Sequence, residues 1–257
     1  MMSKIQYQSI DIASPVRIMI EGLQSGITTQ DLLIMTVCSI FFITMYFTLE
    51  KQVVTLKSRS WIIMLLASSV LAPFGAYYAY DVIMNMKWND EYIYGEDMAT
   101  RFVILFFTAS NIVDFFIGFM RYREHVDPLT TVFHHIFYVI FMLVILSYNY
   151  SRGFVICFFM EIPTWFLALG SVWPNLRSDY LFGVSFFLTR VLFNAFQAYK
   201  LAQLHNDGYI WKICCMVLWL HLYWFKTWWD KYGTYYNYGY NLLQAEMSTI
   251  KAAKKID

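Results

Sequence analysis

The stretch from Val132 to Leu143, VFHHIFYVIFML, decides the fold class of this chain. Apart from the adjacent His134 and His135, its residues are all apolar or aromatic. An ionisable side chain in such a run lies either in a protein core or in a membrane, and in both places it needs a partner. The rest of the sequence decides between the two settings.

The composition places this stretch in a membrane. Of the 257 residues, 59% are hydrophobic and 20% aromatic, while only 14% are charged. Soluble domains carry about 25% charged residues. The formal net charge of +1 argues against a nucleic-acid partner.

Seven apolar runs have about the length, roughly 20 residues, that crosses a hydrocarbon core of about 30 Å. They lie at about 32–49, 61–80, 102–120, 130–148, 153–173, 181–202 and 209–226. They lack the alternation of lipid-facing and lumen-facing residues that marks outer-membrane strands. The sequence therefore predicts an all-α polytopic membrane bundle of about seven transmembrane helices. Residues 1–31 would form a lumenal segment, 32–226 the bundle and 227–257 a cytosolic tail.

The distribution of lysine and arginine predicts the orientation. With a cytosolic C-terminus, the cytosolic segments hold more of these residues than the lumenal ones, including Lys51, Lys57, Arg59, Arg121, Arg123, Arg177, Lys226 and Lys231. Lys254 and Lys255, near the C-terminus, resemble the dilysine retrieval signal of endoplasmic-reticulum membrane proteins, which is read by a receptor. A solvated basic tail is the alternative. We expect the endoplasmic reticulum, with another internal membrane or the plasma membrane as alternatives.

This orientation makes a testable prediction. In sealed microsomes, added protease should remove a tag fused to the C-terminus, because the tail is cytosolic, and should leave an N-terminal tag intact. The measurement is an immunoblot against each tag, with detergent-opened microsomes as the control. Protection of the C-terminal tag would reverse the predicted topology.

Ionisable residues inside the predicted spans are the strongest functional signal. Each costs about 2.5–3.5 kcal/mol at mid-membrane, so such residues usually face the bundle interior and have partners. At about 1.5 Å per residue, the paired histidines lie about 6 to 8 Å inside the cytosolic face. We expect one polar cavity, open toward the cytosolic leaflet and lined by Asp114, His134, His135, Glu161, Arg190 and His221, with Asn194 as a neutral member.

Charge suggests how these residues pair. Glu161 and Arg190 could form a bridge, and Asp114 could hold a histidine ring in one tautomer. Adjacent helical residues point about 100° apart, so one of the two neighbouring histidines should face the cavity and the other a neighbouring helix. Interhelical pairs worth about 0.6–2 kcal/mol each are the purely structural alternative, and His221 fits a packing role better than a reactive one.

A metal site is a weaker interpretation. Three histidines and two acids could coordinate a transition metal. Membrane di-iron hydroxylases, however, have many more histidines, at HxxxH and HxxHH spacings that are absent here. We expect neither a metal nor a cofactor.

Three stretches together resemble a known family. They are residues 112–143, with the paired histidines, residues 158–170, FFMEIPTWFLALG, and residues 181–194, LFGVSFFLTRVLFN. They resemble the core of the TLC domain, shared by translocation-associated membrane proteins, ceramide synthases and smaller TLC-domain-containing proteins. The resemblance covers about residues 40–226. It implies a helical membrane fold with the paired histidines at its site.

The resemblance leaves three functions open. Ceramide synthases have a His-Asp dipeptide in the helix after the paired histidines, where this chain has Glu161, so it looks more like the non-synthase members linked to phospholipid composition. The first hypothesis is lipid handling, with an acyl chain or phospholipid as partner. The second is a CoA-dependent acyltransferase of ceramide-synthase type, with His134 or His135 as base or nucleophile. The third is a structural subunit with membrane-protein partners.

Overall fold

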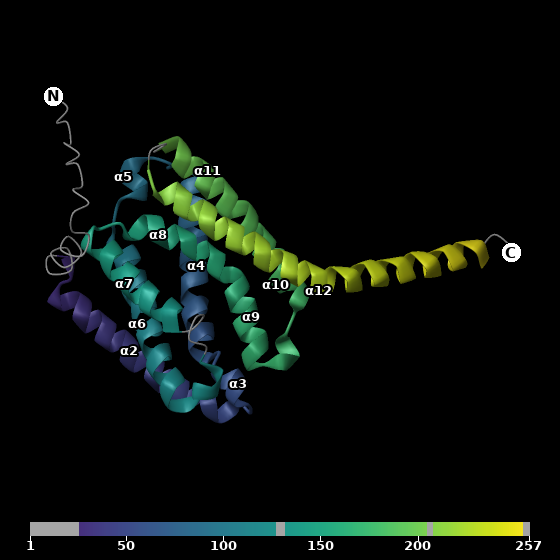
Figure 1. Cartoon of the computed structure of the whole chain (residues 1–257), viewed down its shortest axis with the longest axis horizontal. Coiled ribbons are helices and arrows are strands. Elements are labelled where there is room, and N and C mark those ends of the chain that lie inside the picture. The colour runs from purple at the N-terminus through teal and green to yellow at the C-terminus, as the bar shows by residue number, and fades with distance from the viewer. Residues whose placement is uncertain (1–25, 127–131, 205–207, 254–257) are drawn as a thin grey trace.

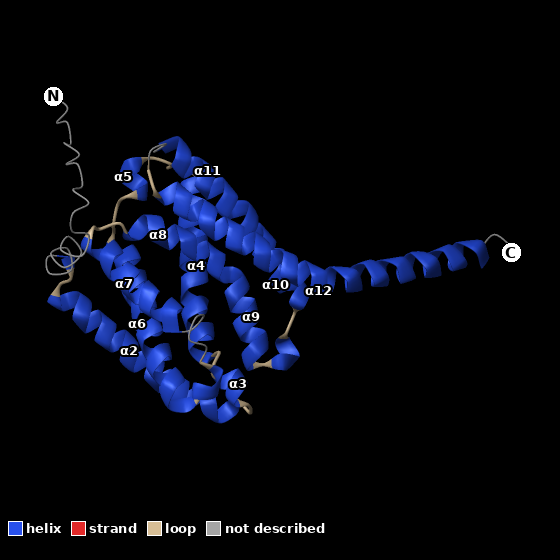
Figure 2. Cartoon of the chain, in the orientation of Figure 1, coloured by secondary structure: helices blue, strands red, loops and turns tan. Residues whose placement is uncertain are grey.

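The computed structural model describes residues 26–126, 132–204 and 208–253, with side chains up to residue 233. Every regular element in these ranges is a helix, and no strand occurs among them (Figure 2). The prediction of an all-α chain is confirmed.

The helices follow the first six predicted spans with small shifts at their ends, whereas the helix of the seventh continues well beyond residue 226. The α-helices are α2 (Thr29–Leu49), α3 (Leu56–Arg59), α4 (Ile62–Met84), α5 (Asp90–Ile93), α6 (Met98–Arg121), α7 (His134–Ser147), α8 (Ser151–Cys157), α9 (Ile162–Val172), α10 (Asp179–Phe186), α11 (Asn194–Leu204) and α12 (Ile210–Ala253). Short 3₁₀ segments are η1 (Glu50–Gln52), η2 (Arg123–His125), η4 (Phe158–Glu161) and η5 (Pro174–Leu176), and η6 (Phe187–Phe193) is π-helical.

The helix lengths and apolarity support a polytopic membrane protein. Within the described residues, five helical segments are long and apolar enough to cross a bilayer: Thr29–Gln52, Leu56–Met84, Met98–Arg121, Ser151–Val172 and Asp179–Leu204. α7 is apolar but shorter, at 14 residues. The seventh predicted span lies in the first half of α12, a helix of 44 residues that is not among these five segments.

The predicted division at residue 226 falls inside α12, which continues without a break to Ala253. The second half of α12 extends away from the bundle (Figure 1). The side of the membrane on which this half lies stays a prediction. Lys254, Lys255 and residues 1–25 of the predicted lumenal segment lie outside the described residues.

The helices form a bundle in which segments far apart in the sequence pack together. Figure 1 places α2, α6 and α7 on one side, α4, α8 and α9 in the middle, and α10 to α12 on the other side. Helix α2 packs on α6, α4 packs on η4 and α9, and α11 packs on α12. We call the end of the bundle with α3, η2 and η5 the α3 end, and the opposite end the α5 end.

Ion pairs tie the helices together at the α5 end. Arg101 of α6 donates to both carboxylate oxygens of Asp31 in α2, at 2.8 and 2.6 Å, and pairs with Glu96 at 2.8 Å. Arg152 of α8 pairs with Asp97, the N-cap of α6, at 3.1 Å. Burial opposes ionisation of Asp97, but hydrogen bonds from its neighbours outweigh burial and lower its pKa. Arg101 and Arg152, on this predicted lumenal side, are thus each paired with acids.

A glycine brings α4 close to the middle of the bundle. A Cβ atom on Gly75 would lie 2.1 Å from the backbone of Phe158 and Phe159 in η4. Pro163, which has no N–H to donate, follows this 3₁₀ segment at the start of α9. The backbone of η4 therefore packs directly against α4, and only glycine fits at the contact.

We predict that Gly75→Ala lowers the free energy of unfolding by about 1–3 kcal/mol, because the added methyl group overpacks a backbone contact. Thermal unfolding in detergent, followed by circular dichroism, measures this. Gly118→Ala is the matched control, since its Cβ would meet first the Cγ2 of Val126, at 3.3 Å. Equal stability of the two variants would show that α4 and η4 can move apart without lowering the free energy of unfolding.

Candidate functional site

A cavity of about 560 Å³ lies inside the bundle. Helices α4, α6, α7, α11 and α12 line it, together with the α8–η4–α9 span and η6. Seven of its lining residues are those that the sequence predicted, namely Asp114, His134, His135, Glu161, Arg190, Asn194 and His221. The fold therefore brings these residues to one place from five separate helical spans.

Asp114 and His135 form a hydrogen-bonded pair in the cavity. Nε2 of His135 lies 3.0 Å from Oδ2 of Asp114, and the Tyr122 hydroxyl donates to Oδ1 at 2.6 Å. Because a carboxylate oxygen only accepts, this contact assigns a proton to Nε2 of His135. The His135 side chain is buried, as expected for the ring that faces a neighbouring helix. Tyr122 was not predicted as a partner, because it lies at the end of α6, outside the predicted span.

His134 has a different environment from its neighbour. It is exposed, and its ring packs against Tyr138 at a centroid distance of 4.6 Å and against His135 at 5.7 Å. Both histidines line the cavity, but only His135 is held by a carboxylate. The accessible imidazole is therefore that of His134, and the oriented one is that of His135.

Arg190 is held from several directions. Its Nε donates to the Met160 carbonyl at 2.9 Å, and its Nη2 donates to the Thr164 hydroxyl at 2.7 Å. Its guanidinium also lies 5.4 Å from the ring centroid of Phe186. The Glu161 carboxylate is 3.6 Å from Nη2, so the predicted charge pair is present but is longer than a hydrogen bond. Thr164 directly follows Glu161-Ile162-Pro163 in the sequence. This closeness to a predicted cavity residue was the sequence signal for its position in the cavity.

The π-helical turn of η6 connects Arg190 to α12. Nδ1 of His221 lies 2.9 Å from the Arg190 carbonyl, and the Asn194 amide nitrogen lies 3.2 Å from the same ring atom. The carbonyl can only accept and the amide nitrogen can only donate, so the two contacts require opposite tautomers of the His221 ring and only one of them is a hydrogen bond at a time. His221 thus packs as expected, yet it also lines the cavity.

The cavity changes character along its length. Toward the α3 end, side chains that can ionise or form hydrogen bonds line it, whereas toward the α5 end the lining is mostly aromatic and aliphatic, with Trp88, Ile93, Tyr94, Ile145, Phe154 and Leu201. Gln197 lies between these regions and donates to the Cys157 sulfur at 3.2 Å. Within the described residues, the buried amide oxygens of Asn194 and Gln197 have no hydrogen-bond partner. The cavity is thus amphipathic and contains unused acceptors.

The rim of the cavity is apolar and reaches the outer surface. Phe137 of α7 lines the cavity and is 48% exposed, and Ile213 of α12 lines it and is 50% exposed. Val217, Leu220 and Trp224, further along α12, are also both lining and exposed. Apolar side chains of α7 and α12 therefore both line the cavity and are exposed.

Comparison with known proteins assigns the family. A model described as the TLC domain matches residues 57–230, more than half of the chain. The chain belongs to the TLC-domain family. It is an integral membrane protein of TLC type, and the matched TLC domain contains every cavity residue named above. Helix α2 and the end of α12 lie outside the match. Searches of curated proteins and of solved structures returned no match.

A metal site receives no support from side-chain clusters. Among the residues whose positions the structure describes, no group of three or more histidine, cysteine, aspartate or glutamate side chains is placed to hold a metal ion. The described cysteines are all free, and Cys157 and Cys214 line the cavity of the TLC domain.

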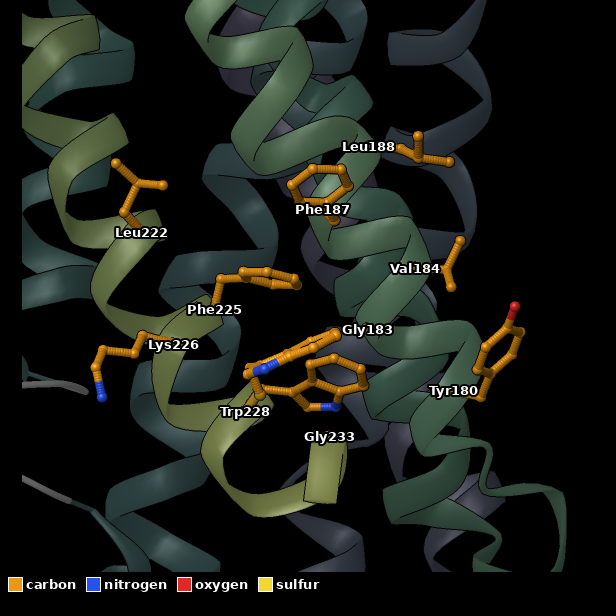
Figure 3. Close-up of a pocket in the computed structure, with 11 residues that line it drawn as sticks. Tyr180, Gly183, Val184, Phe187, Leu188, Leu222, Phe225, Lys226, Trp228 and Gly233 are labelled. Atoms are coloured by element: carbon orange, nitrogen blue, oxygen red, sulfur yellow. The ribbon is translucent and has the colours of Figure 1, made fainter. Parts of the chain in front are cut away.

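A second hollow, of about 730 Å³, lies on the outer surface between α12 and the α10–η6 segment (Figure 3). Phe225 and Trp228 of α12 lie in the space that faces Gly183, while Lys226 points away from them. A Cβ on Gly183 would lie 2.0 Å from the Trp228 ring, so glycine permits this close approach. The hollow contains none of the predicted site residues.

We predict that Asp114→Ala lowers the free energy of unfolding by about 1–3 kcal/mol, because Tyr122 and His135 each lose a buried acceptor. Chemical unfolding in detergent measures the change. Asp179→Ala, which removes an exposed pair with Arg177, is the control and should cost about 0–1 kcal/mol. Equal losses in the two variants would mean that the Asp114 contacts do not stabilise the bundle.

Proposed function

We propose that this TLC protein binds a membrane lipid in its cavity and acts in membrane lipid handling or phospholipid homeostasis. The observation that supports this most directly is the amphipathic cavity with an exposed apolar rim. A lipid has the same two parts, a polar head group and an apolar chain. An endoplasmic-reticulum location, supported by the sequence of Lys254 and Lys255, and a place among the non-synthase members are parts of the same proposal.

On this proposal, the lipid would lie in one orientation. The polar lining on η6 and α7 would receive the head group, and the aromatic lining toward the α5 end would receive the chain. From Ile210 to His221, both lining residues, α12 rises about 16 Å, which leaves room for a substantial part of an acyl chain. Entry between the exposed lining residues of α7 and α12 would let a lipid pass sideways from the bilayer without exposing its chain to water.

Neighbouring cysteines on α12 give a sharp test. Cys214 lines the cavity, whereas Cys215 is exposed and does not. Cys214→Phe should reduce the lipid that copurifies in mild detergent, because the larger side chain fills the cavity. Cys215→Phe should retain the wild-type amount. Native mass spectrometry gives the ratio of lipid to protein, and thermal unfolding checks that both variants fold. Equal lipid occupancy in the two variants would place the bound lipid elsewhere.

Acyl transfer is a second candidate, favoured by the Asp114–His135 contact. A carboxylate that orients an imidazole is the arrangement of a general base. The base would take the proton of an attacking amine or hydroxyl as it adds to the thioester carbonyl of an acyl-CoA, and the CoA thiolate would leave. The test is transfer of a labelled acyl group by the purified protein, which His135→Ala should abolish. Absence of transfer with every acceptor tested would leave lipid binding as the function.

A further inference from the structure

The surface hollow between α12 and the α10–η6 segment is separate from the central cavity. Among the described residues, the two share no lining side chain. Val184 on one wall and Leu222 on the other are both exposed (Figure 3). The α10–η6 wall belongs to a segment that is long and apolar enough to cross a bilayer. The hollow is therefore a feature of the outer surface at a predicted membrane span.

Aromatic rings form much of the α12 wall. The Phe225 ring lies 5.7 Å from the Trp228 ring at an interplanar angle of 22°, and 5.2 Å from the Phe187 ring at 34°. Gly183 lets the Trp228 ring approach α10 closely. Aromatic side chains have few rotatable bonds, so this surface is largely preformed. A rigid, flat ligand can pack against it without the loss of conformational entropy that an acyl chain would incur.

Both walls also carry a sequence pattern proposed for cholesterol contact. The pattern is a basic residue, a tyrosine and a leucine or valine, separated by about one to five residues and read in either direction. The two instances are Leu220, Tyr223 and Lys226 on α12, and Arg177, Tyr180 and Val184 at the start of α10. The pattern is weak evidence by itself, so its placement in the fold decides its value.

The structure brings the two patterns together around the hollow. Tyr180, Val184 and Lys226 line it. Nη2 of Arg177 lies 3.4 Å from the hydroxyl of Tyr232 on α12, so the basic ends of both patterns lie at the same end of the bundle. Because Arg177 directly follows η5, this is the α3 end, which is the predicted cytosolic end. The polar side chains of the hollow thus lie toward the predicted membrane surface, as the hydroxyl of a membrane sterol does.

A phospholipid head group fits this hollow less well. Among the described residues that line it, Lys226 is the only cation, and its ammonium already pairs with Asp230. A phosphate would therefore have to compete with a carboxylate for its one charged donor. A single hydroxyl needs no such partner.

A helix from a second copy also fits less well, because of its size. The hollow has a volume of about 730 Å³, which is within the range of small-molecule pockets, roughly 300–1,000 Å³. From Leu222 to Gly233, α12 rises about 16 Å, whereas a docked transmembrane helix would run along about 30 Å. The dimensions favour a compact ligand.

We propose that this hollow binds one sterol, with its rings against Phe225 and Trp228 and its hydroxyl toward Tyr180 and Lys226. The proposal goes beyond lipid binding in the cavity, because it concerns a separate site and a different class of lipid.

The test is photolabelling of the purified full-length protein in phosphatidylcholine vesicles that contain a diazirine analogue of cholesterol. Mass spectrometry of the peptides should find the label on residues 180–188 and 222–233. Unlabelled cholesterol in about tenfold excess should reduce this labelling at least about fivefold, while the same excess of phosphatidylglycerol should leave it unchanged. Equal competition by the two lipids would show ordinary contact with the bilayer and would overturn the proposal.

Variants on each wall locate the site. Val184→Trp and Leu222→Trp should each reduce labelling at least about fivefold, because the larger ring occupies the volume of the sterol. Leu181→Trp is the matched control, since Leu181 is exposed on the same helix as Val184 and does not line the hollow. Circular dichroism checks folding, and either lining variant is sufficient if the other does not fold. Equal labelling of the folded lining variants and the control would contradict the proposal.

Two further outcomes separate this site from other occupants. Cys214→Phe, which fills the cavity, should be labelled like the wild type, so a failure of the proposed function would leave this inference standing. A loss of labelling in that variant would mean that the probe occupies the cavity instead. Native mass spectrometry would reveal dimers, and dimers that persist in excess cholesterol but are lost in Val184→Trp would make a second copy the occupant.

Discussion

Inside a bilayer, a charged or polar side chain needs a protein partner, because hydrocarbon offers it no hydrogen bonds. The arrangement of this bundle around its cavity follows from that constraint. Asp114 has partners on the end of its own helix and on α7, while Arg190 of η6 is held by η4 and α9. These contacts join helices whose other surfaces are mainly apolar. These contacts therefore determine which helices pack against each other and how the helices are positioned along the bundle axis.

Departures from regular α-helix supply some of these partners. The 3₁₀ segment η4 precedes Pro163, and the carbonyl of Met160 within it accepts from Arg190. The π-helical segment η6 contains Arg190, whose carbonyl faces His221 of α12. Such π segments are frequent at functional sites. Both irregular segments lie against the cavity, so the backbone there serves polar contacts as well as helix continuity.

The polar contacts leave a space that the apolar side chains do not fill. Close packing of α4 on η4 through Gly75 forms one wall, and α7 and α12 line the cavity as well. A soluble protein would lose stability from a cavity of this size, since unfilled volume costs free energy. Under the proposed function, a lipid chain would fill this volume. The ion pairs at the α5 end, such as Arg101 with Asp31, hold the helices together beyond the cavity.

The sequence by itself determined the membrane setting, the helical class and the positions of most helices. The length and composition of an apolar run are set by the thickness of a bilayer, so each span can be recognised from its own residues alone. Charge also indicated that Glu161 would pair with Arg190 and Asp114 with a histidine, since few partners exist for a charge in lipid. Local patterns could not reveal that Tyr122 completes the Asp114 contacts, and for Thr164 they offered only its place directly after Glu161-Ile162-Pro163. Nor could they show that His135 is held while His134 is exposed. Those features depend on how far apart helices lie and how they are rotated, and only the packing of the whole bundle decides that.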